Sequence, residues 1–289
     1  MTLPDHPQFS VIVPVYQQWD LCAKLCAALL AQTLPATRFE VIIVNNGPVT
    51  PPPALDLPPQ MRLLHCTQPG SYAARNVGAA QAQGNWLVFT DADCLPGADW
   101  LTRLAAATGD HPDSLLAGTV RMFATTPPNR FEVYDLLRGI PQDRYVRHGY
   151  AATANLTVPR AVFAMLGGFD AARLSGGDAD FCRRAGQAGH AIQLIPDAWV
   201  GHPCRSNWTA LEVKARRVKG GQLRGGSSRN RRLWLLRSLT PPLRQITRLG
   251  RCDAPAGQRF AAIRIALQLW GVELGEILRL WRGGAAERR

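Results

Sequence analysis

Short apolar segments alternate with alanine-rich amphipathic segments along the first third of the chain. The runs VIVPVY, EVIIVNN, MRLLHC and NWLVFT predict buried strands at residues 11–16, 40–46, 61–66 and 85–90. Between them, helical spacing predicts helices at residues 20–32 and 71–83. This alternation predicts a right-handed α/β layer, in which ligands bind beyond the carboxyl ends of the strands.

Two segments interrupt this regularity. The stretch GPVTPPPALDLPP, residues 47–59, is too rich in proline for a helix or a central strand, so we expect a surface loop. Residues 125–150 have no clear period, and a segment of that length inside a compact domain is typical of a substrate-facing loop or lid.

The net charge of +12 is unevenly distributed. Residues 203–289 hold 19 Lys and Arg against 5 Asp and Glu, which leaves residues 1–202 with a net charge of −2. This asymmetry predicts a nearly neutral body over residues 1–202 and a basic region over residues 203–289, suited to an anionic partner surface.

The end of the basic region has the period of an amphipathic helix. Its apolar residues recur every three or four positions, at Phe260, Ile263, Leu267, Trp270, Leu274, Ile277 and Trp281. The stripe either packs on the body or lies in a membrane interface beside arginines that meet anionic lipid.

Localisation follows from two further features. The N-terminus has no signal-like pattern, and no apolar run approaches the ~20 residues that cross a bilayer. Seven cysteines without a CxxC pair fit a reducing compartment, and Cys22 and Cys26 have the spacing of buried small hydrophobes on one helix face. We expect a cytoplasmic protein, or one peripheral to the inner face of the cell membrane.

The stretch LVFTDADCLP places Asp91 and Asp93 directly after a predicted strand. Carboxylates at i and i+2 of a strand point to the same face, so the pair can hold a divalent cation. Alternatively, two such aspartates cap the following turn or helix. A DxD pair alone does not decide between these readings.

Further motifs accompany the pair, in order along residues 9–202. They are VIVPVY, EVIIVNNG, SYAARNVGAAQAQGNWLVFTDADC, ATANLTVPRAVFAMLGGFD and SGGDADFCRRAGQAGHAIQLIPDAWVGH. Together they resemble the family 2 glycosyltransferases. The resemblance implies a GT-A fold, a Rossmann-like mixed α/β sheet, in a catalytic domain at residues 1–202, followed by a basic helical C-terminal region at residues 203–289.

The resemblance implies that a nucleotide-diphosphate sugar lies across the carboxyl ends of the first strands. Pro14 and Tyr16 would flank the base or ribose. Asn46 stands where the family often has a base-reading aspartate; its amide can still bond a pyrimidine, so a UDP-sugar is the first expectation. Arg75, in AARN, would approach the base or diphosphate, or lie on the helix surface.

In the same resemblance, Asp91 contacts ribose or a metal-bound water, and Asp93 ligates the metal. His202, at the end of AWVGH, matches a later metal-contacting histidine. Mg²⁺ or Mn²⁺ suits such oxygen-rich sites and would stabilise the charge that develops on the departing diphosphate.

Asp178, in SGGDADFC, matches the family's catalytic base, although Gly177 stands where an acidic residue is common. Asp180 is a competing candidate, but its early helical position favours interaction with the helix N-terminus. The resemblance implies single displacement with inversion at the anomeric carbon. Trp100 and Asn155 are predicted to line the donor or acceptor pocket, with a structural role as the alternative.

The acceptor side is less constrained. Processive members of the family carry QxxRW and membrane spans, whereas residues 245–249 read QITRL, so we expect transfer of one sugar to a carbohydrate or lipid-linked acceptor, as in cell-envelope synthesis. A sugar nucleotidyltransferase would usually carry a glycine-rich basic loop after the first strand, where VPVYQQWD stands. A nucleic-acid-binding module is the third reading, but the apolar stripe disfavours a nucleic-acid partner.

Overall fold

The computed structural model describes residues 6–47, 57–224 and 228–285, with side chains in the last range from residue 231. The chain divides into two compact units. The first comprises residues 1–121, 140–172 and 177–202, and the second comprises residues 122–139, 173–176 and 203–289. The second unit therefore includes two segments from before residue 203, in addition to the predicted basic region.

One sheet forms the framework of the first unit. Its eight strands run in the order β3-β2-β1-β4-β7-β6-β8-β5. The strands are β1 (Phe9–Val15), β2 (Phe39–Asn45), β3 (Met61–His65), β4 (Trp86–Phe89), β5 (Leu95–Pro96), β6 (Leu115–Phe123), β7 (Leu156–Pro159) and β8 (Ile192–Pro203). The four strands predicted from sequence correspond to β1 to β4 and are confirmed.

The sheet is parallel on one side and antiparallel on the other. β1 lies between β2 and β4 and is parallel to both, and β3 continues the parallel order beside β2. β4 then pairs antiparallel with β7, and β7 with β6. The carboxyl ends of β1, β2, β3 and β4 therefore meet at one edge, as the alternating sequence pattern predicts.

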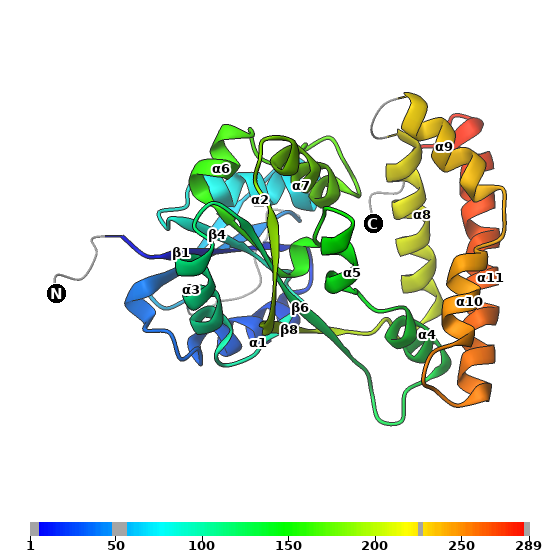
Figure 1. The fold of residues 1–289 in the computed structure, drawn as a ribbon, viewed down its shortest axis with the longest axis horizontal. Helices are drawn as coiled ribbons and strands as arrows, with labels where there is room; N and C mark the ends of the chain where they lie inside the picture. Colours follow the sequence, from blue (N-terminus) through cyan, green and yellow to red (C-terminus); the bar gives the residue numbers. More distant parts are fainter. Residues whose placement is uncertain (1–5, 48–56, 225–227, 286–289) are drawn as a thin grey trace. The chain divides into compact units, whose positions relative to one another are not determined.

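Helices cover both faces of this sheet. They are α1 (Trp19–Leu30), α2 (Ser71–Ala80), α3 (Trp100–Asp110), α5 (Gln142–Arg147), α6 (Arg160–Met165) and α7 (Gly177–Gln187), with short 3₁₀ turns η1 (Ala36–Arg38) and η2 (Thr153–Asn155). Figure 1 shows α2, α6 and α7 over one face and α1 and α3 over the other. The helices predicted at residues 20–32 and 71–83 correspond to α1 and α2 and are confirmed.

The core between the sheet and α2, α6 and α7 is rich in aromatic rings. Phe89 of β4 packs on Phe163 and Phe169, with ring centroids 5.4 and 5.0 Å apart, and Phe169 packs on Tyr72 and Phe181. Alternate residues of β1, such as Ile12, point into this core. This packing fixes α2 and α7, the helices that carry Arg75 and Asp178.

The second unit is helical apart from the ends of β6 and β8. Its helices are α4 (Arg130–Arg138), α8 (Trp208–Arg224), α9 (Ser228–Ser238), α10 (Leu243–Gly250) and α11 (Ala256–Trp281). Helices α4, α8, α10 and α11 share a core formed by Tyr134, Leu211, Leu249, Ala262, Ile265, Ala266 and Leu269. Asp135 of α4 is buried, and although burial favours its neutral form, Lys214 and Arg205 hold its pKa below the usual value.

Residues 125–150 correct one expectation. We predicted an irregular loop, but the segment forms α4 and α5. A capping box starts α4: Asn129 Oδ1 accepts from the N–H groups of Phe131 and Glu132, while Glu132 Oε2 accepts from the Asn129 N–H at 2.9 Å. The N-x-x-E spacing of this box was a sequence signal for a helix start. Most of the proline-rich stretch, residues 48–56, lies outside the described residues.

The apolar stripe of α11 is only partly used for packing. The buried line runs through Ala262, Ile265, Ala266, Leu269 and Ile277. Of the predicted stripe, Ile277 is buried, whereas Phe260, Leu267 and Trp281 are exposed. The buried face of α11 is therefore offset from the predicted stripe, and it contains Ile265, Leu269 and Ile277 as well as the two alanines.

Two absences concern the described part of the chain. None of its helices is long and apolar enough to span a membrane. All seven cysteines carry free thiols, with Cys22 and Cys26 buried on α1 as predicted.

Candidate active site

A tight turn after β4 gathers the two aspartates. The N–H of Cys94 donates to the Asp91 carbonyl at 3.0 Å, which closes a four-residue turn over DADC. We expected strand alternation to align the carboxylates, but both residues follow the end of β4. The turn, and not the strand, brings these carboxylates together: potential ligand atoms of Asp91, Asp93 and Cys94 all lie within 4.8 Å of one another.

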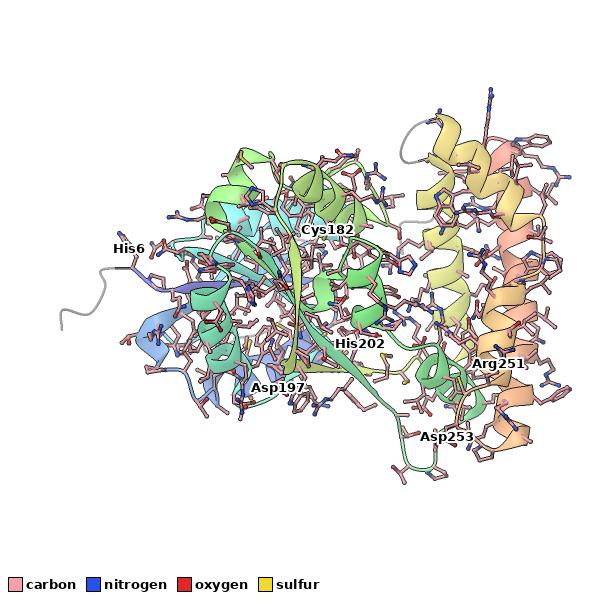
Figure 2. The ribbon with its side chains drawn as sticks, in the orientation of Figure 1. His6, Cys182, Asp197, His202, Arg251 and Asp253 are labelled. Atoms are coloured by element: carbon pink, nitrogen blue, oxygen red, sulfur yellow. The ribbon has the colours of Figure 1, made fainter. Side chains whose placement is uncertain are left out.

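Strand pairing brings His202 to this turn. β5 pairs antiparallel with β8, with Leu95 opposite Gly201, so the next positions along the ladder place Cys94 beside His202. His202 Nε2 lies 3.8 Å from Asp93 Oδ1, and the histidine is buried near the end of β8 (Figure 2). The DADC turn and His202 therefore form one cluster, although more than a hundred residues separate them in the sequence.

The donor set of this cluster fits a hard divalent cation. Asp91 and Asp93 offer carboxylate oxygens from partly exposed side chains, and His202 offers an imidazole nitrogen. Cys94 does not suit the site, because burial and the neighbouring Asp91 and Asp93 charges raise the pKa of its thiol well above the usual value. Carboxylate and imidazole without thiolate is a set suited to Mg²⁺ or Mn²⁺.

The first turn of α2 connects this cluster to Asp178. Tyr72 and Arg75 are three residues apart and lie on one side of the helix. Arg75 Nη2 pairs with Asp91 Oδ1, and the Tyr72 hydroxyl donates to Asp178 Oδ1 at 3.2 Å. The arginine also lies over the Tyr72 ring, 5.6 Å from its centroid. One helical turn therefore holds the DADC turn and Asp178 near the same end of α2.

Asp178 lies in the first turn of α7. Burial raises the pKa of its carboxyl above the usual value, against the opposing effects of the Ala179 N–H, Arg75, the Tyr72 hydroxyl and the Thr153 backbone. The Ala179 N–H donates to Asp178 Oδ1 at 2.8 Å. Oδ1 is thus fixed by two donors, and a carboxylate with a raised pKa is better able to accept a proton.

The ends of β1 and β2 form the predicted nucleotide side of the site. Pro14 and Tyr16 are half-buried there, and Gln17 adopts a left-handed φ of 57°. Asn46 is already engaged: Nδ2 donates to the carbonyls of Cys66 and Gln68 at 3.0 and 2.7 Å, and Oδ1 accepts from Gly70 N–H at 2.8 Å. In this structure Asn46 ties the loop before α2 to the end of β2.

Trp100 and Asn155, which were predicted to line the donor or acceptor pocket, form hydrogen bonds within the core. Both are fully buried. Trp100 Nε1 donates to Asn155 Oδ1 at 3.0 Å, and Asn155 Nδ2 donates to the carbonyls of Thr119 and Ala198 at 3.0 and 2.9 Å. These bonds join α3, η2, β6 and β8.

Comparison with known proteins decides the family. The family model described as glycosyl transferase family 2 matches residues 10–164. The chain belongs to this family. Glycosyltransferase AglE of Haloferax volcanii is 31% identical over 223 residues, covering 74% of this chain and 73% of its own length. The succinoglycan biosynthesis protein ExoM of Rhizobium meliloti is 29% identical over 227 residues, covering 74% and 72%.

Solved structures confirm the GT-A fold of this family 2 glycosyltransferase. The mannosyltransferase PcManGT from Pyrobaculum calidifontis, solved with GDP-Man and Mn²⁺, has a TM-score of 0.60 at 16% identity, covering 96% of this chain and 88% of its own. TarS from S. aureus, solved with UDP-GlcNAc, has a TM-score of 0.58 at 19% identity, covering 96% and 92%.

Tyr72 is a residue of the candidate site that the sequence did not predict. Tyr72 was not singled out, although its position three residues before Arg75 places both side chains on one face of the predicted helix. A cavity of about 390 Å³ lies elsewhere, lined by residues of α5, α7 and the start of β8, including Cys182 and Arg183. None of its lining residues is a predicted site residue.

Proposed function

We propose that this glycosyltransferase moves one sugar from a nucleotide-diphosphate sugar to an acceptor hydroxyl, with inversion at the anomeric carbon. The observation that supports this most is the linkage through α2, in which Arg75 pairs with Asp91 and Tyr72 bonds Asp178. A donor-binding carboxylate cluster and a base-like carboxylate are the two parts that such a displacement needs.

Asp178 would take the proton of the acceptor hydroxyl. As the proton moves to the carboxylate, the acceptor oxygen forms a bond to the anomeric carbon on the face opposite the diphosphate. The bond from that carbon to the diphosphate oxygen breaks, and the nucleoside diphosphate leaves with the electron pair. The raised pKa of Asp178 matches this role, because a stronger base shares the proton earlier in the displacement.

Asp93 and His202 would hold a Mg²⁺ or Mn²⁺ ion, with Asp91 directed at ribose or a metal-bound water. The ion, when bound, neutralises charge that develops on the departing diphosphate. Arg75 would keep Asp91 in place, because its buried guanidinium is already paired with that carboxylate. Pro14 and Tyr16 would line the base or ribose side.

The nucleotide and the acceptor are open to test. The neighbours solved with UDP-GlcNAc and GDP-Man differ in both base and sugar, so we put UDP-sugars first and GDP-sugars second. A carbohydrate or lipid-linked acceptor in cell-envelope synthesis is supported by the name of the Rhizobium relative, which assigns that protein to succinoglycan biosynthesis. A cytoplasmic location, peripheral to the inner membrane face, would bring the enzyme to such an acceptor.

The decisive experiment compares Asp178→Asn with Asp180→Asn. After a screen of nucleotide sugars by thermal stabilisation, product formation and donor affinity are measured for both variants. We expect Asp178→Asn to lower kcat by ~10²–10⁴ with donor affinity retained. Asp180→Asn is the matched control, because Asp180 pairs with Arg184 at 3.1 Å, one turn along α7, and should keep most activity.

Transfer that survives in Asp178→Asn would remove this residue from the role of base. Retention of anomeric configuration in the product would contradict a single displacement.

A further inference from the structure

The segment from Arg231 to Arg244, here called the α9 surface, exposes an unusual combination of side chains. Of the twelve large apolar side chains exposed in the described residues, nine lie between Leu233 and Trp281. Five of these nine belong to the α9 surface: Leu233, Trp234, Leu236, Leu239 and Leu243. Leu236, Leu239 and Leu243 are 62%, 58% and 64% exposed, which is far more than leucines in a folded domain usually show.

Polar contacts of Ser238 attach the α9 surface to neighbouring helices. Ser238 is buried, where its hydroxyl accepts from Lys219 Nζ at 2.7 Å and its carbonyl accepts from Trp270 Nε1 at 2.8 Å. Lys219 also pairs with Glu273 at 2.8 Å. These contacts attach the end of α9 to α8 and α11. The leucines are therefore exposed on a fixed element.

Charge identifies the partner. Residues 231–251 contain six arginines and no Asp or Glu, and Arg231, Arg232, Arg237 and Arg244 are exposed among the leucines. A second copy of the chain would bring a further net charge of +12 to this surface. Nucleic acid would satisfy the arginines but leave the leucines in water. An anionic bilayer surface offers phosphates for the arginines and hydrocarbon for Leu236, Leu239 and Leu243.

We propose that the α9 surface docks on anionic lipid. The indole of Trp234, with Arg237 5.8 Å from its ring centroid, lies at the level of the headgroups, as Trp does at membrane interfaces. The leucines enter the acyl boundary, and the arginines bind lipid phosphates.

The test uses the full chain and vesicles, without a nucleotide sugar, so that its outcome is independent of the transfer reaction. We expect co-sedimentation with vesicles of phosphatidylcholine mixed with phosphatidylglycerol, and little with phosphatidylcholine alone. Each substitution Arg232→Gln, Arg237→Gln or Arg244→Gln should weaken partitioning by about fivefold, in proportion to the attraction of one basic residue to an anionic surface. Leu236→Ser with Leu239→Ser should also weaken it.

Matched controls come from the first unit. Leu30→Ser removes a leucine that is 51% exposed on α1, and Arg103→Gln removes an exposed arginine of α3. Both should bind vesicles like the parent, and thermal unfolding verifies that every variant is folded. The proposal would be overturned if the protein bound neutral vesicles equally well, or if the control variants lost as much binding as the test variants. It would also be overturned if the protein preferred RNA to vesicles, or if it formed a dimer that Leu236→Ser disrupts.

A second and independent observation concerns Gly177. A Cβ built on Gly177 would lie 2.8 Å from two carbons of the Tyr72 ring, closer than side chains approach. The ring therefore fills the space that any side chain at position 177 would occupy.

We infer that Tyr72 is a positioning residue for Asp178, and that the lack of a side chain at Gly177 leaves space for the Tyr72 ring. This inference rests on the proposed function. The hydroxyl of Tyr72 fixes Oδ1 of Asp178 at 3.2 Å, and burial raises the pKa of the phenol, so it stays a donor. Asp178 also interacts electrostatically with three other groups. Arg75 lowers the pKa of Asp178, and the Asp178 charge raises the pKa of Tyr150 and Cys182.

Tyr72→Phe keeps the ring and removes the hydroxyl. We expect kcat to fall by about tenfold, with little change in the donor KM, because a hydrogen bond to a charged group is lost. The acid limb of the kcat/KM profile should move to higher pH, because the hydroxyl favours the ionised Asp178. Tyr134→Phe, which removes a buried tyrosine hydroxyl bonded to Gln245, is the matched control and should shift neither.

Gly177→Ala tests the second half of the inference. It should lower kcat in the parent but add nothing in a Tyr72→Ala background, where the ring is absent. If the losses in kcat from Gly177→Ala and Tyr72→Ala were additive, the inferred link between Gly177 and the Tyr72 ring would be overturned. If Asp178→Asn abolishes transfer while Tyr72→Phe changes neither kcat nor the acid limb, only the positioning role fails; if Asp178→Asn retains transfer, the proposed function itself fails.

Discussion

Arg75 Nη2 and Asp91 Oδ1 form an ion pair between a buried guanidinium and the first carboxylate of the DADC turn. The pair joins α2 to the turn after β4. A buried arginine without its carboxylate would be an uncompensated charge, so the turn and the helix stabilise each other.

The pair predicts a measurable coupling. Arg75→Met and Asp91→Asn should each destabilise the protein, and the double variant should lose less than the sum of the two. We expect a coupling energy of about 1–3 kcal/mol from urea unfolding of the four proteins in the cycle. Strict additivity would mean that the two side chains do not interact in solution.

A metal at the DADC turn predicts stabilisation by Mn²⁺. At a free ion concentration one hundred times its Kd, binding should raise the free energy of unfolding by about 2.7 kcal/mol. Asp93→Asn should lose this effect, and chelation should reverse it in the parent. Asp110→Asn is the control, because Asp110 is exposed at the end of α3. Equal stabilisation of parent and Asp93→Asn would place the ion elsewhere.

The raised pKa of Asp178 predicts a cost to stability. A carboxyl whose pKa is higher in the folded state binds its proton more tightly there, so its ionisation destabilises the fold as pH rises through the folded pKa. Asp178→Asn should therefore be more stable than the parent at neutral pH. The difference should shrink as pH falls toward ~3.9, the ordinary aspartate value. Urea unfolding across this range checks the sign, and a difference that grows toward acid pH would contradict it.

The bonds of Asn155 predict a structural phenotype. Asn155→Ala leaves Trp100 Nε1 and the carbonyls of Thr119 and Ala198 without this partner in the core. We expect a loss of about 2–5 kcal/mol in the free energy of unfolding, with donor and acceptor KM unchanged in the folded fraction. A raised KM at unchanged stability would return Asn155 to the substrate pocket.

The sequence was sufficient for the parallel half of the sheet, because β1 to β4 are continuous apolar runs whose burial leaves a strong local pattern. The sequence was insufficient to predict α4, because its capping box is a weaker signal for a helix than the surrounding proline and arginine residues are for a loop. The exposed part of the α11 stripe shows a second limit: periodicity identifies an apolar face but not which neighbour, if any, covers it.

The residues of the candidate site also differ in how well the sequence predicts them. Asp91 and Asp93 are separated by one residue in the sequence, so a short motif identifies them. The approach of His202 depends on the β5–β8 register, and the contact of Tyr72 with Asp178 depends on how α2 and α7 pack. The roles of Trp100 and Asn155 could not be read from residue type, because an amide that serves a ligand and one that serves the core look alike in sequence.

The path of the chain between its two units has a practical consequence. Besides residues 203–289, the second unit takes α4 from the middle of the chain, and Tyr134 of α4 belongs to its core. A protein cut after His202 would keep α4 but lose Leu211, Leu249 and Ile265, with which Tyr134 packs. Truncation would thus expose apolar surface, and exchanging the second unit with that of a relative would require grafting discontinuous segments.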